Sequence, residues 1–134
     1  MPTIRAVVLA LPIADRARAL AFYRDVLGLE PFGAPGDDGI PEPLQFRLDE
    51  RTSLMLVPTG GFGWVLGGRE AAAPNVSECV LGLEVSSEQD VREFLARFPG
   101  SGGAVLVEPT REPWGFSGLG TDPDGHAWQI TAAG

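Results

Sequence analysis

The apolar segment Val8-Leu9-Ala10-Leu11 returns 72 residues later as Val80-Leu81-Gly82-Leu83. The same offset places Phe22 against Phe94. Similarity at a fixed offset indicates that one structural unit is used twice along the chain. We therefore predict two similar halves, each of which opens with an apolar strand.

An amphipathic segment follows the opening strand in each half. The first runs from about Asp15 to Leu27 and the second from about Ser87 to Phe98, and both carry the apolar spacing of a helix with one buried face. Ser87, or Ser86 before it, is a suitable N-cap. Gly28 and Gly100 fit the left-handed position that ends a helix. Each opening strand is thus predicted to lead into one helix.

Three candidate strands follow each predicted helix, separated by turn residues such as Asp122-Pro123-Asp124-Gly125. They cover Leu29–Ala34, Leu44–Asp49 and Thr52–Pro58 in the first half, and Ala104–Glu108, Trp114–Thr121 and His126–Thr131 in the second. The fold class is α+β, with two tandem βαβββ modules that form a curved mixed sheet around a pocket. We predict one domain over residues 1–134, with halves at about 1–58 and 78–134 and a loop as the linker at 59–77.

Composition and charge limit the compartment and the partners. The chain of 134 residues has a formal net charge of −8 and 10 basic residues, all of them arginine. This argues against binding to nucleic acid or to an anionic membrane, since both require a basic surface. No apolar run has the length of a membrane helix, and the beginning lacks the pattern of a signal peptide, so we expect a cytoplasmic protein. Cys79, the one cysteine, lies in an apolar run and is predicted to be a buried structural thiol.

Two segments carry a resemblance to a known family. One is Ala14–Leu29 (ADRARALAFYRDVLGL), and the other extends from Trp114-Gly115-Phe116 through the turn Asp122–Gly125 to Ile130. They resemble the first helix and the closing hairpin of the vicinal oxygen chelate superfamily. That superfamily includes glyoxalase I, extradiol dioxygenases, and bleomycin- and mitomycin-binding resistance proteins. Together with the repeat, the resemblance covers nearly the whole chain, but a fold does not by itself assign a function.

The resemblance also implies where a metal would be bound. In the metal-using members four strands each supply one ligand, and the corresponding places in this sequence hold Val8, Met55, Val80 and Gln129. Valine has no donor atom, methionine has a soft thioether, and glutamine has a neutral carbonyl, whereas divalent cations prefer nitrogen, oxygen or thiolate donors. We therefore expect no metal and no other cofactor. His126, the one histidine, is interpreted as a structural residue of the closing hairpin.

Aromatic residues near the expected pocket are the first candidate ligand contacts. Trp114 lies in a turn, and Phe62 and Trp64 lie in the glycine-rich segment Gly60-Gly61-Phe62-Gly63-Trp64. Such rings stack on flat ligands. The alternative is that Phe62 and Trp64 seal the linker against the sheet or against a partner subunit, and the sequence favours neither interpretation.

Polar residues on the pocket side of the strands are the second group of candidates. Strand alternation directs Arg47, Met55, Glu84 and Gln129 to the side opposite the helices. Arg47 and Glu84 either orient a polar ligand or form an ion pair with each other. Gln129 either binds a carbonyl or amide group of a ligand or is satisfied by water. Arg111 is a further exposed candidate.

The sequence favours a metal-independent small-molecule-binding protein of the glyoxalase/bleomycin-resistance type, one that sequesters a planar natural product or metabolite. No residue is assigned a catalytic role in this interpretation. One alternative is a glyoxalase-like or dioxygenase-like lyase or isomerase, with a non-standard base such as Glu84 or His126. Another is a subunit with a structural or regulatory role. We expect a homodimer, because open curved sheets need their edges covered.

Overall fold

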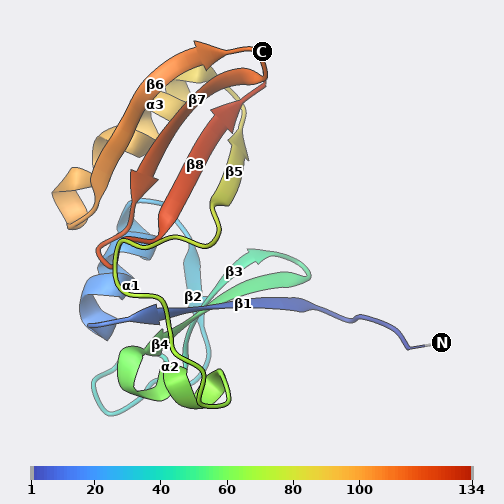
Figure 1. Cartoon of the computed structure of the whole chain (residues 1–134), viewed down its shortest axis with the longest axis vertical. Helices are drawn as coiled ribbons and strands as arrows, with labels where there is room; N and C mark the ends of the chain where they lie inside the picture. Colours follow the sequence, from blue (N-terminus) through green and yellow to red (C-terminus); the bar gives the residue numbers. More distant parts are fainter. Residues whose placement is uncertain (1, 134) are drawn as a thin grey trace. The chain divides into compact units, whose positions relative to one another are not determined.

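The computed structural model describes residues 2–133, which form two compact units that divide between Ala71 and Ala72. Each unit contains a four-stranded mixed sheet with a helix packed on one face (Figure 1). The predicted α+β class and the two tandem modules are therefore confirmed. No helix among these residues is long and apolar enough to cross a membrane.

The first unit has the strand order β1-β4-β3-β2. β1 runs parallel to β4, and the other neighbouring strands are antiparallel. Its elements are β1 (Val7–Ile13), α1 (Arg16–Asp25), β2 (Glu30–Phe32), β3 (Leu44–Asp49), β4 (Thr52–Pro58) and α2 (Thr59–Val65). The bounds of β3 and β4 agree with the prediction.

Local sequence signals fix both ends of α1. The Asp15 side chain accepts a hydrogen bond of 3.0 Å from the Arg18 amide, which satisfies one of the free donors of the first turn. After the helix, Gly28 adopts a φ of +68° and lets the Leu29 amide bond back to the carbonyl of Tyr23. The helix packs its apolar side on the sheet, and the buried residues of this layer are Ala19, Phe22, Tyr23, Val26, Leu27, Leu44, Phe46, Leu54 and Leu56.

The second unit repeats this arrangement with the strand order β5-β8-β7-β6, and β5 runs parallel to β8. The Ser87 hydroxyl caps the helix by accepting a hydrogen bond from the Asp90 amide, as predicted. The elements are β5 (Leu81–Val85), α3 (Glu88–Arg97), the short 3₁₀ helix η1 (Pro99–Ser101), β6 (Ala104–Glu112), β7 (Gly115–Thr121) and β8 (Ala127–Ala132). Its core comprises Val91, Leu95, Phe98, Phe116, Trp128, Ile130 and Ala132.

Two of the loop and helix-end predictions are wrong. The linker was expected to be a loop, but its first residues form α2, Thr59–Val65. This helix buries Phe62 and therefore forms despite its three glycines. Gly100 does not end the second helix in a left-handed conformation, because Pro99 starts the additional turn η1 and moves that conformation to Gly102, with φ +88°.

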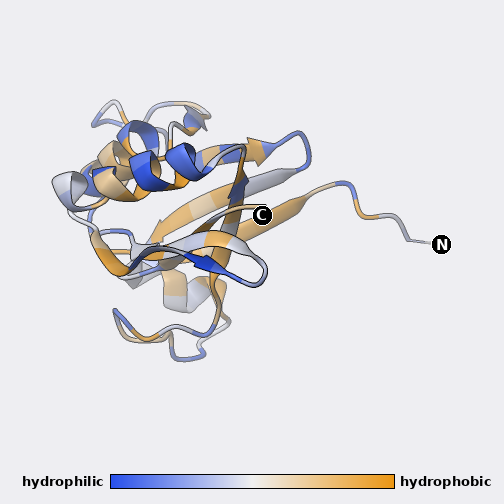
Figure 2. Ribbon diagram, turned by 90° about the horizontal axis from the view of Figure 1, so that it is seen from above, coloured by the Kyte–Doolittle hydropathy of each residue, from blue (hydrophilic) through white to orange (hydrophobic). Residues whose placement is uncertain are grey.

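The prediction of a buried Cys79 is also wrong. The thiol-bearing residue is exposed, because β5 begins only at Leu81 and Cys79 precedes the sheet. The apolar run around it therefore belongs only in part to a strand. Figure 2 shows the contrast with β1, the strand that leads away from the N-terminus, whose ribbon is coloured hydrophobic along most of its length.

Candidate functional site

We call the side of each sheet away from α1 or α3 its open face. In the first unit, register brings Ala10, Met55, Gln45 and Phe32 into one row across β1, β4, β3 and β2. Directly paired residues of neighbouring strands point to the same side, so these four share the open face. Their side chains are half-buried, whereas Leu54 and Leu56, on the opposite side of β4, are buried. The predicted face assignment of Met55 is confirmed by this burial pattern.

A cation lies over an aromatic ring on this face. The Arg47 guanidinium carbon is 4.6 Å from the centroid of the Phe32 ring. Such an arrangement is attractive because the ring face carries negative charge. Met55 and Val57 are half-buried on β4, and Val8 on β1 is 53% exposed. The open face of the first unit thus combines apolar side chains with the polar Gln45 and Ser53 and the cationic Arg47.

The strand registers relate the four positions at which the resemblance implies metal ligands. Val8 lies two residues before Ala10, the register partner of Met55. In the second unit Val80 lies two residues before Gly82, the register partner of Gln129. Each unit therefore holds its pair in the same relation between an edge strand and its parallel neighbour, which supports the alignment made from the sequence.

These four side chains do not fit a divalent cation. Val8 and Val80 offer no donor, and a thioether and a neutral amide cannot replace the hydration of a doubly charged ion. Across residues 2–133 the structure also holds no cluster of three or more His, Cys, Asp or Glu side chains that would form a metal site. These positions therefore do not support a chemical step through a metal.

The open face of the second unit is more polar. Gln129 on β8 is half-buried, and Glu84 on β5 is exposed. Thr131 follows on the same side of β8, and its hydroxyl lies 2.8 Å from that of Ser117 on β7. Arg47 belongs to the first unit and Glu84 to the second, so an ion pair between them stays a prediction.

The candidate aromatic residues differ sharply in exposure. Trp64 on α2 is 86% exposed and Trp114, in the turn between β6 and β7, is 61% exposed. Phe62 is only 8% exposed, and the third tryptophan, Trp128, is 1% exposed in the core of its unit. Two indole rings are thus open to stacking, whereas the Phe62 side chain lies on the buried side of α2 and contributes to the apolar interior.

Two other candidates have partners within the second unit. Arg111 forms an ion pair with Glu88 at the start of α3. The backbone of His126 is fixed in the closing turn, where its amide donates a hydrogen bond of 2.8 Å to the Asp122 carboxylate and its carbonyl accepts from the Asp122 amide. This turn geometry supports the structural interpretation of His126.

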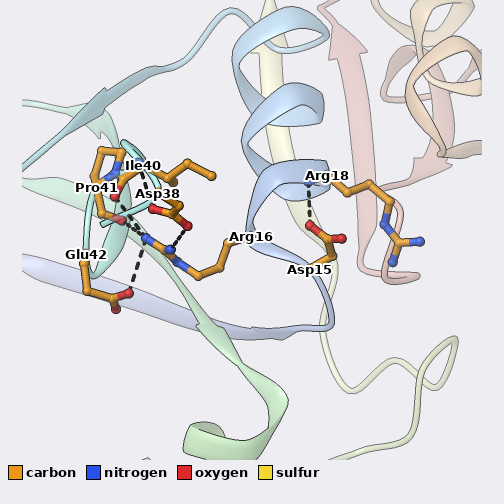
Figure 3. A network of polar contacts seen from close by, with 7 residues as sticks. All are labelled: Asp15, Arg16, Arg18, Asp38, Ile40, Pro41 and Glu42. Atoms are coloured by element: carbon orange, nitrogen blue, oxygen red, sulfur yellow. Dashed lines mark hydrogen bonds and ion pairs between the residues drawn. The ribbon is translucent and has the colours of Figure 1, made fainter. Parts of the chain in front are cut away.

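A polar network around Arg16, which is shown in Figure 3, was not predicted from the sequence. The guanidinium forms an ion pair with Asp38, and its Nη2 donates to the carbonyls of Ile40 and Pro41 and lies 3.3 Å from the Glu42 carboxylate. The Arg16 side chain is 17% exposed. Its fork therefore pins the loop between β2 and β3 to the start of α1. The sequence feature that could have predicted this network is Arg16, directly after the N-cap Asp15, together with the acidic residues Asp38 and Glu42 of the later loop.

A shallow hollow of about 500 Å³ lies at the beginning of β1, beside Ile4 and Arg51. Its polar groups bond to one another: the Arg51 guanidinium donates to the Ile4 carbonyl at 2.8 Å, and the Arg51 amide donates to Asp49. The hydrogen bond from this amide is the main reason that the pKa of Asp49 is lowered. These bonds occupy the Arg51 and Asp49 groups with partners inside the protein.

The chain was compared with known proteins. No curated protein matches it. Among solved structures, a glyoxalase-related enzyme from Fulvimarina pelagi has a TM-score of 0.81 at 24% identity, over 95% of this chain and 86% of that one. TnmS3, an antibiotic binding protein from Streptomyces sp. CB03234, has a TM-score of 0.65 at 23% identity, over 100% and 98%. A glyoxalase/bleomycin resistance protein from the same organism has a TM-score of 0.60 at 25% identity, over 94% and 98%.

These likenesses establish the fold, and the sequence profile of one family extends over most of the chain. The profile described as the Glyoxalase/Bleomycin resistance protein/Dioxygenase superfamily matches residues 5–130. The chain therefore belongs to the glyoxalase/bleomycin resistance protein/dioxygenase superfamily, the family of the vicinal oxygen chelate fold.

Proposed function

We propose that this protein binds a planar small molecule on the open faces of its sheets without the help of a metal ion. The observation that carries the proposal is the chemistry at the four positions where relatives hold metal ligands. Val8, Met55, Val80 and Gln129 supply no anionic donor, so the Lewis acid that polarises a substrate and acidifies water is not available there. Binding does not require that chemistry.

The surfaces of the first unit support a flat, apolar ligand. Met55 and Val57 give apolar contact area, and the Arg47 guanidinium, whose carbon lies 4.6 Å from the centroid of the Phe32 ring, adds a flat cation. Trp64 provides an accessible indole ring in the same unit, and Trp114 provides another in the second unit. Among the structural relatives, TnmS3 is described as antibiotic binding, which is consistent with sequestration of a natural product.

Native mass spectrometry of freshly purified protein tests the binding function. We expect an adduct of a small organic molecule that is released on denaturation. The matched metal experiment is elemental analysis after dialysis against zinc, nickel, manganese and iron, with far less than one ion per chain expected. A stoichiometric ion that is lost in a Met55→Ala or Gln129→Ala variant, but retained in a Gln45→Ala control, would contradict the proposal.

A second candidate function is a metal-independent lyase or isomerase. The observation that favours it is Glu84, whose carboxylate lies on the open face and has no hydrogen bond or ion pair within residues 72–133 of the second unit. An accessible carboxylate of this kind is a chemically reasonable proton acceptor. Turnover of a bound ligand in the presence of a chelator, abolished by Glu84→Gln, would favour this candidate. Saturable binding with no change in the ligand favours the binding function.

A further inference from the structure

A row of polar side chains crosses the whole open face of the second sheet. Register places Glu84 of β5 beside Thr131 of β8, Thr131 beside Ser117 of β7, and Ser117 beside Thr110 of β6. Figure 1 shows these four strands side by side. On the open face of the first sheet, the row through Ser53 and Arg47 begins at the apolar Val8 of β1 and contains a cationic side chain at its centre. The two open faces therefore differ in chemistry.

Ser117 and Thr131, at the centre of the row, form a hydrogen bond between their hydroxyl groups that fixes the orientation of the Thr131 side chain. Ser117 Oγ and Thr131 Oγ1 are 2.8 Å apart, and Ser117 is only 5% exposed. One hydrogen bond between two hydroxyls uses one hydrogen, so lone pairs remain for another donor. Ser117 is thus a positioning residue, and Thr131, which is half-buried, presents an oriented oxygen on the open face.

Glu84 supplies a negatively charged carboxylate on the strand next to this Thr131 oxygen. Its carboxylate has only acceptor sites when it is ionised, and it forms no ion pair or hydrogen bond within residues 72–133 of its own unit. A carboxylate and a hydroxyl oxygen on adjacent strands match a group with several N–H donors. A protonated amine is such a group, and its hydrogen bonds to a carboxylate are charge-assisted.

The charge of the second unit favours a cation at this row. Residues 72–134 contain nine carboxylate side chains and three arginines, so the unit carries −6 of the chain's net −8. All three arginines contact other groups: Arg92 lies over the Phe116 ring, Arg97 lies over the Phe94 ring, and Arg111 pairs with Glu88. The resulting negative potential attracts a cationic ligand.

We propose that Glu84 and Thr131 form a subsite for the protonated amino group of a planar ligand, with Ser117 as the positioning residue. This inference rests on the proposed binding function and names the chemical class of its ligand. The subsite selects between ligands of equal shape by charge, because a neutral ring system leaves Glu84 without a partner.

The test uses 9-aminoacridine and acridine, two flat tricyclic probes of nearly equal size. At mildly alkaline pH the first is a cation with N–H donors and the second is neutral. We expect the wild-type protein to bind 9-aminoacridine at least about tenfold more tightly, the usual effect of a charge-assisted hydrogen bond. Glu84→Gln and Thr131→Val should reduce this preference, through a larger loss of affinity for 9-aminoacridine than for acridine.

Glu93→Gln is the matched control, because it removes the same charge from the same unit. Glu93 lies on α3, where its carboxylate accepts a hydrogen bond from Gln89. Retention of the preference in this variant, together with its loss in Glu84→Gln, supports the subsite. Equal loss in both variants, or equal binding of the two probes by the wild type, overturns it and leaves the binding function intact. Binding of neither probe also overturns the subsite. The binding function is then tested separately by native mass spectrometry of the freshly purified protein, which detects any retained ligand.

Discussion

Gly118 leaves the space that the side chain of Leu95 occupies, because a Cβ built on Gly118 would lie 2.3 Å from Leu95 Cδ1. Gly120 has the same relation to Phe98, with a Cβ distance of 2.5 Å to the ring. Both glycines lie on the side of β7 that faces α3. The helix therefore packs against the backbone of the strand, and the close approach depends on the absence of side chains there.

Gly118→Ala should destabilise the protein by about 1–3 kcal/mol, the usual cost of forcing an extra carbon into a packed core. Leu95 has to move, and the carbonyl of Val107 at 3.0 Å limits the movement of the strand. The free energy of unfolding in urea measures the effect. Gly82→Ala on β5 is the control, since its Cβ meets nothing within 4 Å and should leave stability nearly unchanged. Equal losses in the two variants would show that strand flexibility, not packing, explains the effect.

Gly125→Ala should cost more stability than Gly28→Ala. Both glycines have positive φ, +87° and +68°, which costs a residue with a side chain about 1–2 kcal/mol. Only at Gly125 would the Cβ also collide with a neighbour, the backbone nitrogen of Asn75 at 2.7 Å. Thermal unfolding of the two variants measures the difference. A smaller loss at Gly125 would show that the segment around Asn75 moves away without cost.

Arg16→Ala should free the loop between β2 and β3. The variant loses the fork that bonds Asp38 and the carbonyls of Ile40 and Pro41, and we expect a loss of about 1–2 kcal/mol and faster amide exchange in the loop. Hydrogen exchange followed by mass spectrometry checks this. Arg24→Ala, which removes an exposed pair with the adjacent Asp25, should leave both stability and loop exchange unchanged. Protection of the loop in Arg16→Ala would refute the pinning role.

Emission from Trp64 and Trp114 should respond to a bound planar ligand, because both rings are exposed, whereas Trp128 is buried. Quenching should be reduced in Trp64→Phe or Trp114→Phe and retained in Trp128→Phe. Acrylamide, a small collisional quencher, provides a control for exposure of each ring without a ligand. Loss of quenching only in Trp128→Phe would mean that the ligand enters the core of the second unit.

The protein should be a homodimer in solution. Each sheet ends in unpaired edge strands, and Val7, Val8 and Val80 near two of these edges are about half exposed. Edges and apolar residues of this kind are usually covered. Light scattering should give twice the chain mass of 14.2 kDa. A single species at the mass of one chain, at micromolar concentration, would contradict this prediction.

Alternation and capping made much of the fold predictable from the sequence. β3 and β4 have the predicted bounds because apolar and polar residues alternate along them, as in Leu44–Asp49. The strand β6 extends four residues past the predicted end at Glu108. As an edge strand it tolerates Pro109, and its register to β7 shifts between Val107 and Thr110.

The candidate site was less predictable, because its polar contacts join segments far apart in the chain. Strand parity correctly placed Met55 and Gln129 on the open faces. Parity alone does not show that Ser117 and Thr131 bond across two strands, because that contact depends on register. The bond from Arg16 to the loop at Ile40 depends likewise on the path of a loop that has no regular pattern.

Cys79 gives the natural protein a unique point of chemical attachment. It is the one cysteine of the chain, its side chain is exposed, and it lies two residues before β5. A nitroxide coupled to this thiol needs no substitution elsewhere and reports from the boundary between the linker and the second sheet. In a symmetric dimer the two labels form a single pair, so one measured distance distribution describes how the two copies are arranged.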